Sequence, residues 1–156
     1  MTSWSPSRGG DVVNRIPSYW LVTAQLVCLL FLLATRPFVF ARPWLGLEMA
    51  GLGVGLWALA AMRRSRLRIR PEPHPESVLI KHGPYRWVRH PMYTAVLLVA
   101  GGWVGYAPTG GRVLAGAALV VVLLLKIRRE EQLLAEKFPD YAAYRTTTWR
   151  LLPPIW

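Results

Sequence analysis

Polar, aromatic and turn-forming side chains are concentrated in residues 79–93, with the sequence LIKHGPYRWVRHPMY. Gly83-Pro84 predicts a turn, because glycine tolerates unusual φ values and proline fixes its own. Pro91 begins a long apolar stretch, and proline at the first position of a helix loses no hydrogen bond. Arg89 and His90 are therefore predicted at a helix N-terminus, where free N–H groups and the helix dipole favour an anion. An arginine there can also grip a carboxylate bidentately. We favour this functional role over simple anchoring at the membrane interface.

Two adjacent carboxylates, Glu130 and Glu131, form the second reactive group, within the sequence KIRREEQLLAEKF. If the preceding apolar stretch continues as a helix, Glu130 interrupts a stripe of apolar residues and Glu131 lies beside it. The apolar members of that stripe are Leu123, Ile127, Leu134 and Phe138. A carboxylate close to a membrane needs a partner. Two kinds of partner remain open: an arginine in a structural ion pair, or a ligand that carries a cation or a hydroxyl group.

Four apolar stretches must position these residues, at 19–40, 43–62, 92–106 and 113–125. They predict an all-α, polytopic membrane helix bundle with about four transmembrane helices, folded as a single domain over residues 1–156. A helix of about 20 residues crosses the hydrocarbon core. The last two stretches are shorter, so their helices must include flanking residues at the membrane interface. Small residues would let the backbones of the second and third helices approach closely, namely Gly51, Gly55, Gly101 and Gly102.

The net charge of +11 arises from 19 Lys+Arg against 8 Asp+Glu. Most basic residues follow the second and fourth stretches, and the positive-inside rule places those segments in the cytoplasm. Contact with an anionic membrane surface explains this layout better than nucleic acid does. We therefore expect a multi-pass integral protein of a bacterial plasma membrane, with no nucleic-acid partner. Neither Cys28 nor the three histidines have zinc-ligand spacing, so no metal is expected.

Further aromatic residues follow the two glutamates. Tyr141 and Tyr144 are spaced to share one side of a short helix, and anchoring at the membrane interface is the favoured role for each. The C-terminal sequence 149–154 could form a lid or a reinserted segment.

The pattern Gly83-Pro84-Tyr85-Arg86-x-x-Arg89-His90-Pro91-x-Tyr93, followed by an apolar stretch and Arg129-Glu130-Glu131, resembles the isoprenylcysteine carboxyl methyltransferase family. Leu134, Phe138, Tyr141 and Tyr144 continue the match, and phospholipid N-methyltransferases share much of it. The region that carries the resemblance is 79–153. It implies a membrane-embedded methyltransferase that uses S-adenosylmethionine, held in a pocket at the cytoplasmic face.

The resemblance also implies roles for individual residues. Arg89 and Glu131 would be catalytic, at the reacting end. The residues implied to line the cofactor pocket are Leu79, Ile80, His82, Gly83, Pro84, Tyr85, His90, Tyr93 and Glu130. The implied acceptor is a lipid or another lipophilic small molecule, methylated on a carboxylate or an amine. A carboxylate needs no base and would be oriented by Arg89, whereas a protonated amine would need Glu130 or Glu131 to remove a proton.

Two alternative hypotheses come from other classes. NADPH-dependent sterol-type membrane reductases are similar around Arg-x-Pro-x-Tyr, but Asn typically follows the proline there, whereas this chain has Met92. A non-catalytic membrane scaffold would show no affinity for a cofactor. Binding of S-adenosylhomocysteine or of NADPH discriminates among the three.

Overall fold

The computed structural model describes residues 18–35, 42–64 and 79–153, and the described chain is all-α. A short 3-10 helix, η1 (Gly83–Arg86), precedes α4. The α-helices are α2 (Ser18–Ala34), α3 (Arg42–Arg64), α4 (Pro91–Tyr106), α5 (Gly110–Lys137) and α6 (Tyr141–Thr147). The only extended pairing in these ranges is an isolated bridge between Val88 and Trp149. The predicted all-α class is confirmed.

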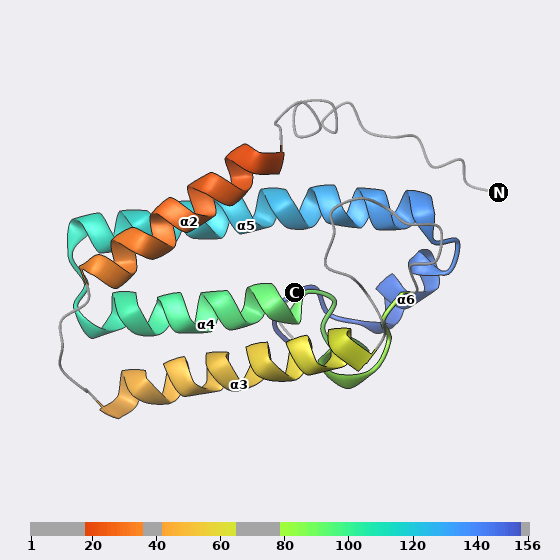
Figure 1. Ribbon diagram of the computed structural model, residues 1–156, viewed down its shortest axis with the longest axis horizontal. Coiled ribbons are helices and arrows are strands. Elements are labelled where there is room, and N and C mark those ends of the chain that lie inside the picture. The colour runs from red at the N-terminus through yellow and green to blue at the C-terminus, as the bar shows by residue number, and fades with distance from the viewer. Residues whose placement is uncertain (1–17, 36–41, 65–78, 154–156) are drawn as a thin grey trace.

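The long helices run back and forth along the bundle (Figure 1). α4 lies between α3 and α5, and α2 packs mainly against α5. The turn between α4 and α5 lies at one end, whereas η1 and α6 lie at the other. The N-terminus of α4 therefore meets the C-terminal parts of α3 and α5 at the end that contains η1 and α6.

The helices agree with most of the predicted stretches. α3 and α4 begin and end within two residues of the predicted 43–62 and 92–106. α2 ends at Ala34, and residues 36–40 of the first stretch lie outside the described ranges. α5 continues well beyond its apolar part, 113–125, as expected for a helix that reaches the two glutamates. By length and hydropathy, Pro43–Arg63 and Gly110–Lys137 are able to cross a membrane, and Tyr19–Ala34 is a shorter apolar helix.

The turn between α4 and α5 is closed by reciprocal caps. The Thr109 side chain accepts a hydrogen bond from the backbone N–H of Arg112, at the start of α5. The buried guanidinium of Arg112 donates to the carbonyl oxygens of Trp103 and Ala107, which end α4. These carbonyls would otherwise lack partners at the helix C-terminus. Arg112 is thus a structural cation far from the predicted site.

Glycines allow α3 and α4 to pack closely. A Cβ atom at Gly51 would lie 2.8 Å from the backbone oxygen of Ala95. One at Gly102 would lie 3.1 Å from the backbone oxygen of Trp44. The predicted close approach is confirmed at these two positions. At Gly101 the nearest atom would lie at an ordinary 3.5 Å, so that residue is not required for it.

Alanine at Gly51 and at Gly53 should have opposite effects. Gly53 is exposed, with no atom within 4 Å of an added Cβ. There the better helix propensity of alanine should leave the melting temperature unchanged or raised. Gly51→Ala should lower the unfolding free energy by about 1–3 kcal/mol, because backbone must move away. Thermal unfolding of both variants in detergent tests this, and equal stabilities would contradict the packing argument.

Candidate functional site

Local backbone chemistry sets the start of α4. Gly83 has φ +63°, which suits glycine, and a Cβ there would approach that of Ala61 on α3 to 3.1 Å. Pro84 is buried in η1, and Pro91 is the first residue of α4, with His90 as its N-cap. The predicted turn and helix start are confirmed. Together they place residues 83–93 against the ends of α3 and α5.

An accessible carboxylate lies against aromatic rings at this point. The Tyr93 hydroxyl donates to Glu130 Oε1, and His90 Nδ1 lies 3.6 Å from Glu130 Oε2. The His90 and Tyr93 rings stack with centroids 5.7 Å apart. Burial and the Glu130 charge raise the pKa of Tyr85 to about 12, so its phenol stays neutral. The Glu130 side chain is 44% exposed, whereas that of His90 is 5% exposed. We call Tyr85, His90, Tyr93 and Glu130 the Glu130 cluster.

Glu131, by contrast, is enclosed by cations. Arg89 Nε donates to Oε1 at 3.0 Å, and Arg150 binds both oxygens, with Nη2 at 2.7 Å from Oε2. His90 Nε2 lies 3.5 Å from Oε1. Glu131 follows the apolar part of α5. Burial by itself raises the pKa of Glu131, but the nearby His90 ring and the hydrogen bonds from Arg150 and Arg89 outweigh it and lower the pKa to about 2. This carboxylate is therefore ionised at neutral pH and is a poor proton acceptor.

His90 lies between the two carboxylates. Burial acts to lower its pKa, but the interactions with Glu130 and Glu131 outweigh burial and raise the pKa above the ordinary value. The cationic form of this imidazole is therefore more populated at a given pH than that of a free histidine. The imidazole links the accessible carboxylate to the enclosed one.

The last described segment, residues 148–153, crosses the start of α4, and we call it the C-terminal strap. Trp149 N donates to Trp87 O at 2.8 Å, and Arg89 N donates back to Trp149 O at 2.8 Å. His90 N donates to Arg150 O, and the Thr94 hydroxyl donates to Leu151 O at 2.6 Å. The prediction of free N–H groups for an anion at Arg89 and His90 is therefore wrong, because the strap uses those groups.

Arg89 is also occupied by the strap. Besides Glu131, its guanidinium donates to the carbonyl oxygens of Arg145 and Thr148 and to the Thr148 hydroxyl. Its side chain is 8% exposed. A guanidinium with these partners ties the segment before α4 to α5, α6 and the strap.

Two expectations about side-chain direction are wrong. The buried row of α5 is Leu119, Leu123, Ile127 and Glu131, so Glu131, and not Glu130, interrupts the packed face. Tyr141 and Tyr144 share one side of α6 as predicted, but both are buried at 1% and 7% exposure instead of anchoring at an interface. The Tyr144 hydroxyl donates to the carbonyl oxygen of Tyr85 at 2.6 Å, which holds η1 against α6.

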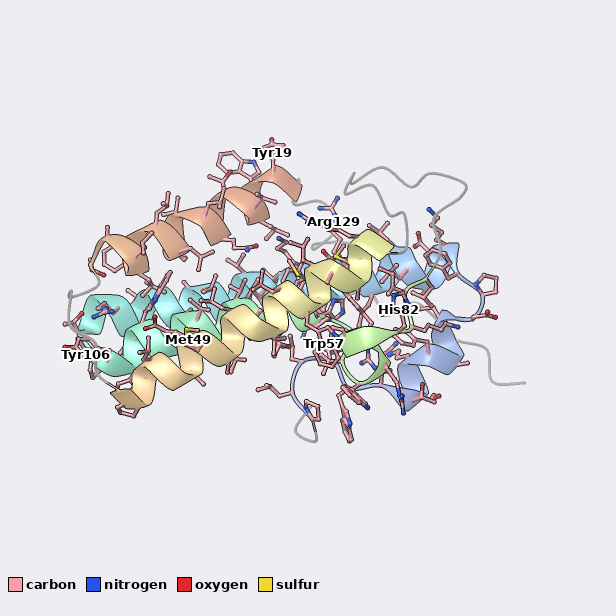
Figure 2. All side chains as sticks on the ribbon, turned by 60° about the horizontal axis from the view of Figure 1, so that its bottom comes forward. Tyr19, Met49, Trp57, His82, Tyr106 and Arg129 are labelled. Atoms are coloured by element: carbon pink, nitrogen blue, oxygen red, sulfur yellow. The ribbon has the colours of Figure 1, made fainter. Side chains whose placement is uncertain are left out.

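The remaining predicted cofactor residues lie on the segment that leads into η1. Ile80 is buried, Leu79 is half-buried and the side chain of His82 is exposed. Figure 2 shows His82 and Arg129 toward the same end of the bundle, with Tyr106 at the opposite end. Three residues with polar contacts here were not predicted: Arg150 on the strap, Lys126 on α5 and Gln25 on α2. A polar residue within an apolar helix was the available signal for Gln25.

An apolar groove of about 480 Å³ lies between α3, α4, η1 and the strap. Trp57, Trp87 and Trp149 contribute to its walls, and none of its lining residues is ionisable. The ionisable chemistry therefore lies on the α5 side of α4, in the Glu130 cluster and around Glu131.

The chain is similar in sequence to known proteins over most of its length. Residues 41–141 match the phospholipid methyltransferase family. That family includes the isoprenylcysteine carboxyl methyltransferases, and this chain belongs to it. The chain is also 30% identical over 162 aligned residues to the cobalt-zinc-cadmium resistance protein CzcN of Cupriavidus metallidurans. That alignment covers 99% of this chain and 74% of CzcN. The apolar helices and the family together indicate a membrane protein of a methyltransferase family.

Proposed function

We propose that this chain is an S-adenosylmethionine-dependent membrane methyltransferase, similar to the isoprenylcysteine carboxyl methyltransferases. It transfers a methyl group to a carboxylate or amine of a lipophilic acceptor. The observation that carries the proposal is the Glu130 cluster, an accessible carboxylate among aromatic rings, in a chain of this family.

The chemistry of the cluster fits the cofactor. S-adenosylmethionine has a cationic sulfonium, ribose hydroxyls and a flat adenine, and it supplies an electrophilic methyl group when bound. Glu130 can accept from hydroxyl or ammonium donors, and Tyr93 holds its carboxylate in place. Tyr85, which is half-buried, offers ring surface for stacking or cation–π contact. The proposed cofactor residues are Leu79, Ile80, His82, Gly83, Pro84, Tyr85, His90, Tyr93 and Glu130.

Arg89 and Glu131 support this site as positioning residues. Their mutual contact, with Arg150, fixes the strap and the orientation of His90. Because Glu131 stays ionised among its cations, Glu130 is the carboxylate left for deprotonating an amine acceptor. A carboxylate acceptor would need no base. Transfer would then depend on positioning and the exclusion of water.

We also propose that α2, α3, α4 and α5 each cross the membrane of a bacterial cell, with the Glu130 cluster at the cytoplasmic face. The support is the alternating direction of the helices (Figure 1) and the basic residues at the cluster's end of α3 and α5. The lipophilic acceptor would reach the site from the bilayer.

Calorimetric titration of the detergent-purified protein with S-adenosylhomocysteine tests the proposal. We expect binding that Glu130→Ala weakens by at least about tenfold, because a hydrogen bond to a charged group is worth about 1.5–3 kcal/mol. Glu136→Ala removes an exposed carboxylate from the same helix and should bind like the unaltered protein. Binding of NADPH instead, or equal losses in both variants, would contradict the proposal.

A further inference from the structure

A lysine and a glutamine meet beside the Glu130 cluster, on its α2 side. Lys126 Nζ donates to Gln25 Oε1 at 2.7 Å and lies 5.2 Å from the centroid of the Tyr93 ring. Lys126 precedes Glu130 by one helical turn on α5, so both side chains lie along the same row. Three helices, α2, α4 and α5, therefore contribute to one polar junction.

Both residues are polar in otherwise apolar surroundings, and they are hydrogen-bonded to each other. The sequence of α2, SYWLVTAQLVCLLFLLA, has no charged residue, and Gln25 is near its middle. Lys126 follows directly on the apolar part of α5, 113–125, and both side chains are half-buried. Ionisable and polar side chains at such positions are costly and commonly mark substrate pathways.

The junction presents hydrogen-bond donors to a ligand. An ammonium has three N–H donors and no acceptor, and Gln25 Oε1 takes one of them. The amide nitrogen of Gln25 adds two more donors. None of the ion pairs of the described chain joins Lys126 directly to a carboxylate, although the charge of Glu130, one turn along α5, acts on it. A positive group with spare donors suits an anion and disfavours an ammonium.

Gln25 lies outside the family match, which begins at residue 41. The features shared with the family therefore do not include the α2 side of this junction. Figure 2 shows the Tyr19 end of α2 standing away from α5. If α2 crosses the membrane as proposed, lipid would reach this side of the bundle. A residue that lies outside the part of the chain shared with the family is well placed to select the substrate.

We propose that Lys126 and Gln25 bind the anionic headgroup, carboxylate or phosphate, of an amphiphilic methyl acceptor that enters beside α2. The proposal rests on the proposed function because it takes the bound amphiphile to be the methyl acceptor. The binding of an anionic amphiphile is argued only from the contacts of Lys126 and Gln25. It predicts that the protein prefers anionic amphiphiles to neutral or cationic ones of the same chain length.

Native mass spectrometry of the full-length protein in detergent tests this with oleic acid, methyl oleate, oleylamine and dioleoylphosphatidic acid as probes. Oleic acid and methyl oleate differ by one charge on the same chain. We expect oleic acid and the phosphatidic acid to bind at least about tenfold more tightly than methyl oleate or oleylamine, as for a charge-assisted hydrogen bond. Inorganic phosphate should not displace oleic acid. Displacement by phosphate would overturn the assignment to an amphiphile and indicate a site for a free anion.

Variants locate the preference. Lys126→Gln should abolish the preference for anionic over neutral or cationic amphiphiles. Gln25→Leu should reduce this preference and Lys126→Arg should keep it. Arg128→Gln removes a charge from an exposed position on the same helix and should leave it intact. A preference that survives Lys126→Gln, or that is absent from the unaltered protein, overturns the inference.

Binding of S-adenosylhomocysteine to the same preparations separates this inference from the proposed function. Each variant that binds the nucleoside like the unaltered protein is folded and has its cofactor site, so a lost oleate preference then belongs to Lys126 or Gln25. Loss of the preference in the unaltered protein, with nucleoside binding intact, defeats only the inference. Absence of nucleoside binding in the unaltered protein defeats the proposed function. The comparison of oleic acid with methyl oleate then still shows whether Lys126 and Gln25 bind an anionic headgroup.

Discussion

Replacing Glu131 by alanine is expected to lower the free energy of unfolding by about 3–5 kcal/mol, the usual cost of breaking a buried ion pair. The variant leaves Arg89 and Arg150 without their shared carboxylate, at 8% and 17% side-chain exposure. The strap should then loosen on α4, because Arg150 loses both of its bonds to Glu131 while only the strap's bonds to residues 87–94 remain along the start of α4. Thermal unfolding gives the stability, and the rate of tryptic cleavage after Arg150 reports release of the strap.

Two further variants make this result specific. Glu136→Ala removes an exposed carboxylate from α5 and should change neither the melting temperature nor the cleavage rate. Glu131→Asp keeps the charge on a shorter side chain and should recover part of the loss. If Glu131→Ala kept full stability and a protected strap but lost methyl transfer, Glu131 would act on the reacting groups and not on the strap.

The parts of the fold that follow local rules were predictable from the sequence. The conformations at Gly83 and Pro91 depend only on neighbouring residues in the chain. The structure has a positive φ at Gly83 and a helix that starts at Pro91. The spacing of apolar residues likewise predicted α3 and α4 closely. The all-α class and the helix boundaries depend on such local terms.

The direction of individual side chains was less predictable. From Ile127, both Glu130 and Glu131 continue an apolar row, one at three residues and the other at four. Packing against α2 and α4 selects the row of Leu123, Ile127 and Glu131, which periodicity along α5 cannot determine. The choice separates an accessible carboxylate from an enclosed one. The two neighbouring glutamates thus acquire different chemistry from one step of helical rotation.

Long-range partners account for the remaining differences. Arg150 binds Glu131 from the strap. Gln25 binds Lys126 from α2, more than 100 positions earlier in the chain. The residue types signalled that partners must exist, because buried charges are paired. Which residue supplies the partner depends on how the helices assemble. The resemblance over 79–153 assigned no role to Arg150, and Gln25 lies before the family match, which begins at residue 41.

Replacing Arg89 by lysine is expected to lower the unfolding free energy by about 1.5–3 kcal/mol, as for the loss of hydrogen bonds to charged groups. Arg89 donates through different nitrogens to Glu131 and to the carbonyl oxygens of Arg145 and Thr148. A lysine keeps the charge but has one nitrogen, which cannot reach both sides of this arrangement. The strap should therefore loosen although the net charge is unchanged.

Kinetics distinguish this positioning role from direct contact with the acceptor. If Arg89 acts through the strap, Arg89→Lys should lower kcat and the affinity for S-adenosylhomocysteine together with stability, and should increase cleavage after Arg150. Arg86→Lys makes the same exchange at an exposed residue of η1 and should leave all four quantities unchanged. A higher KM for the acceptor, with stability and nucleoside affinity intact, would instead make Arg89 the group that orients the acceptor. Because the guanidinium is already bound to Glu131 and the strap, we expect the first result.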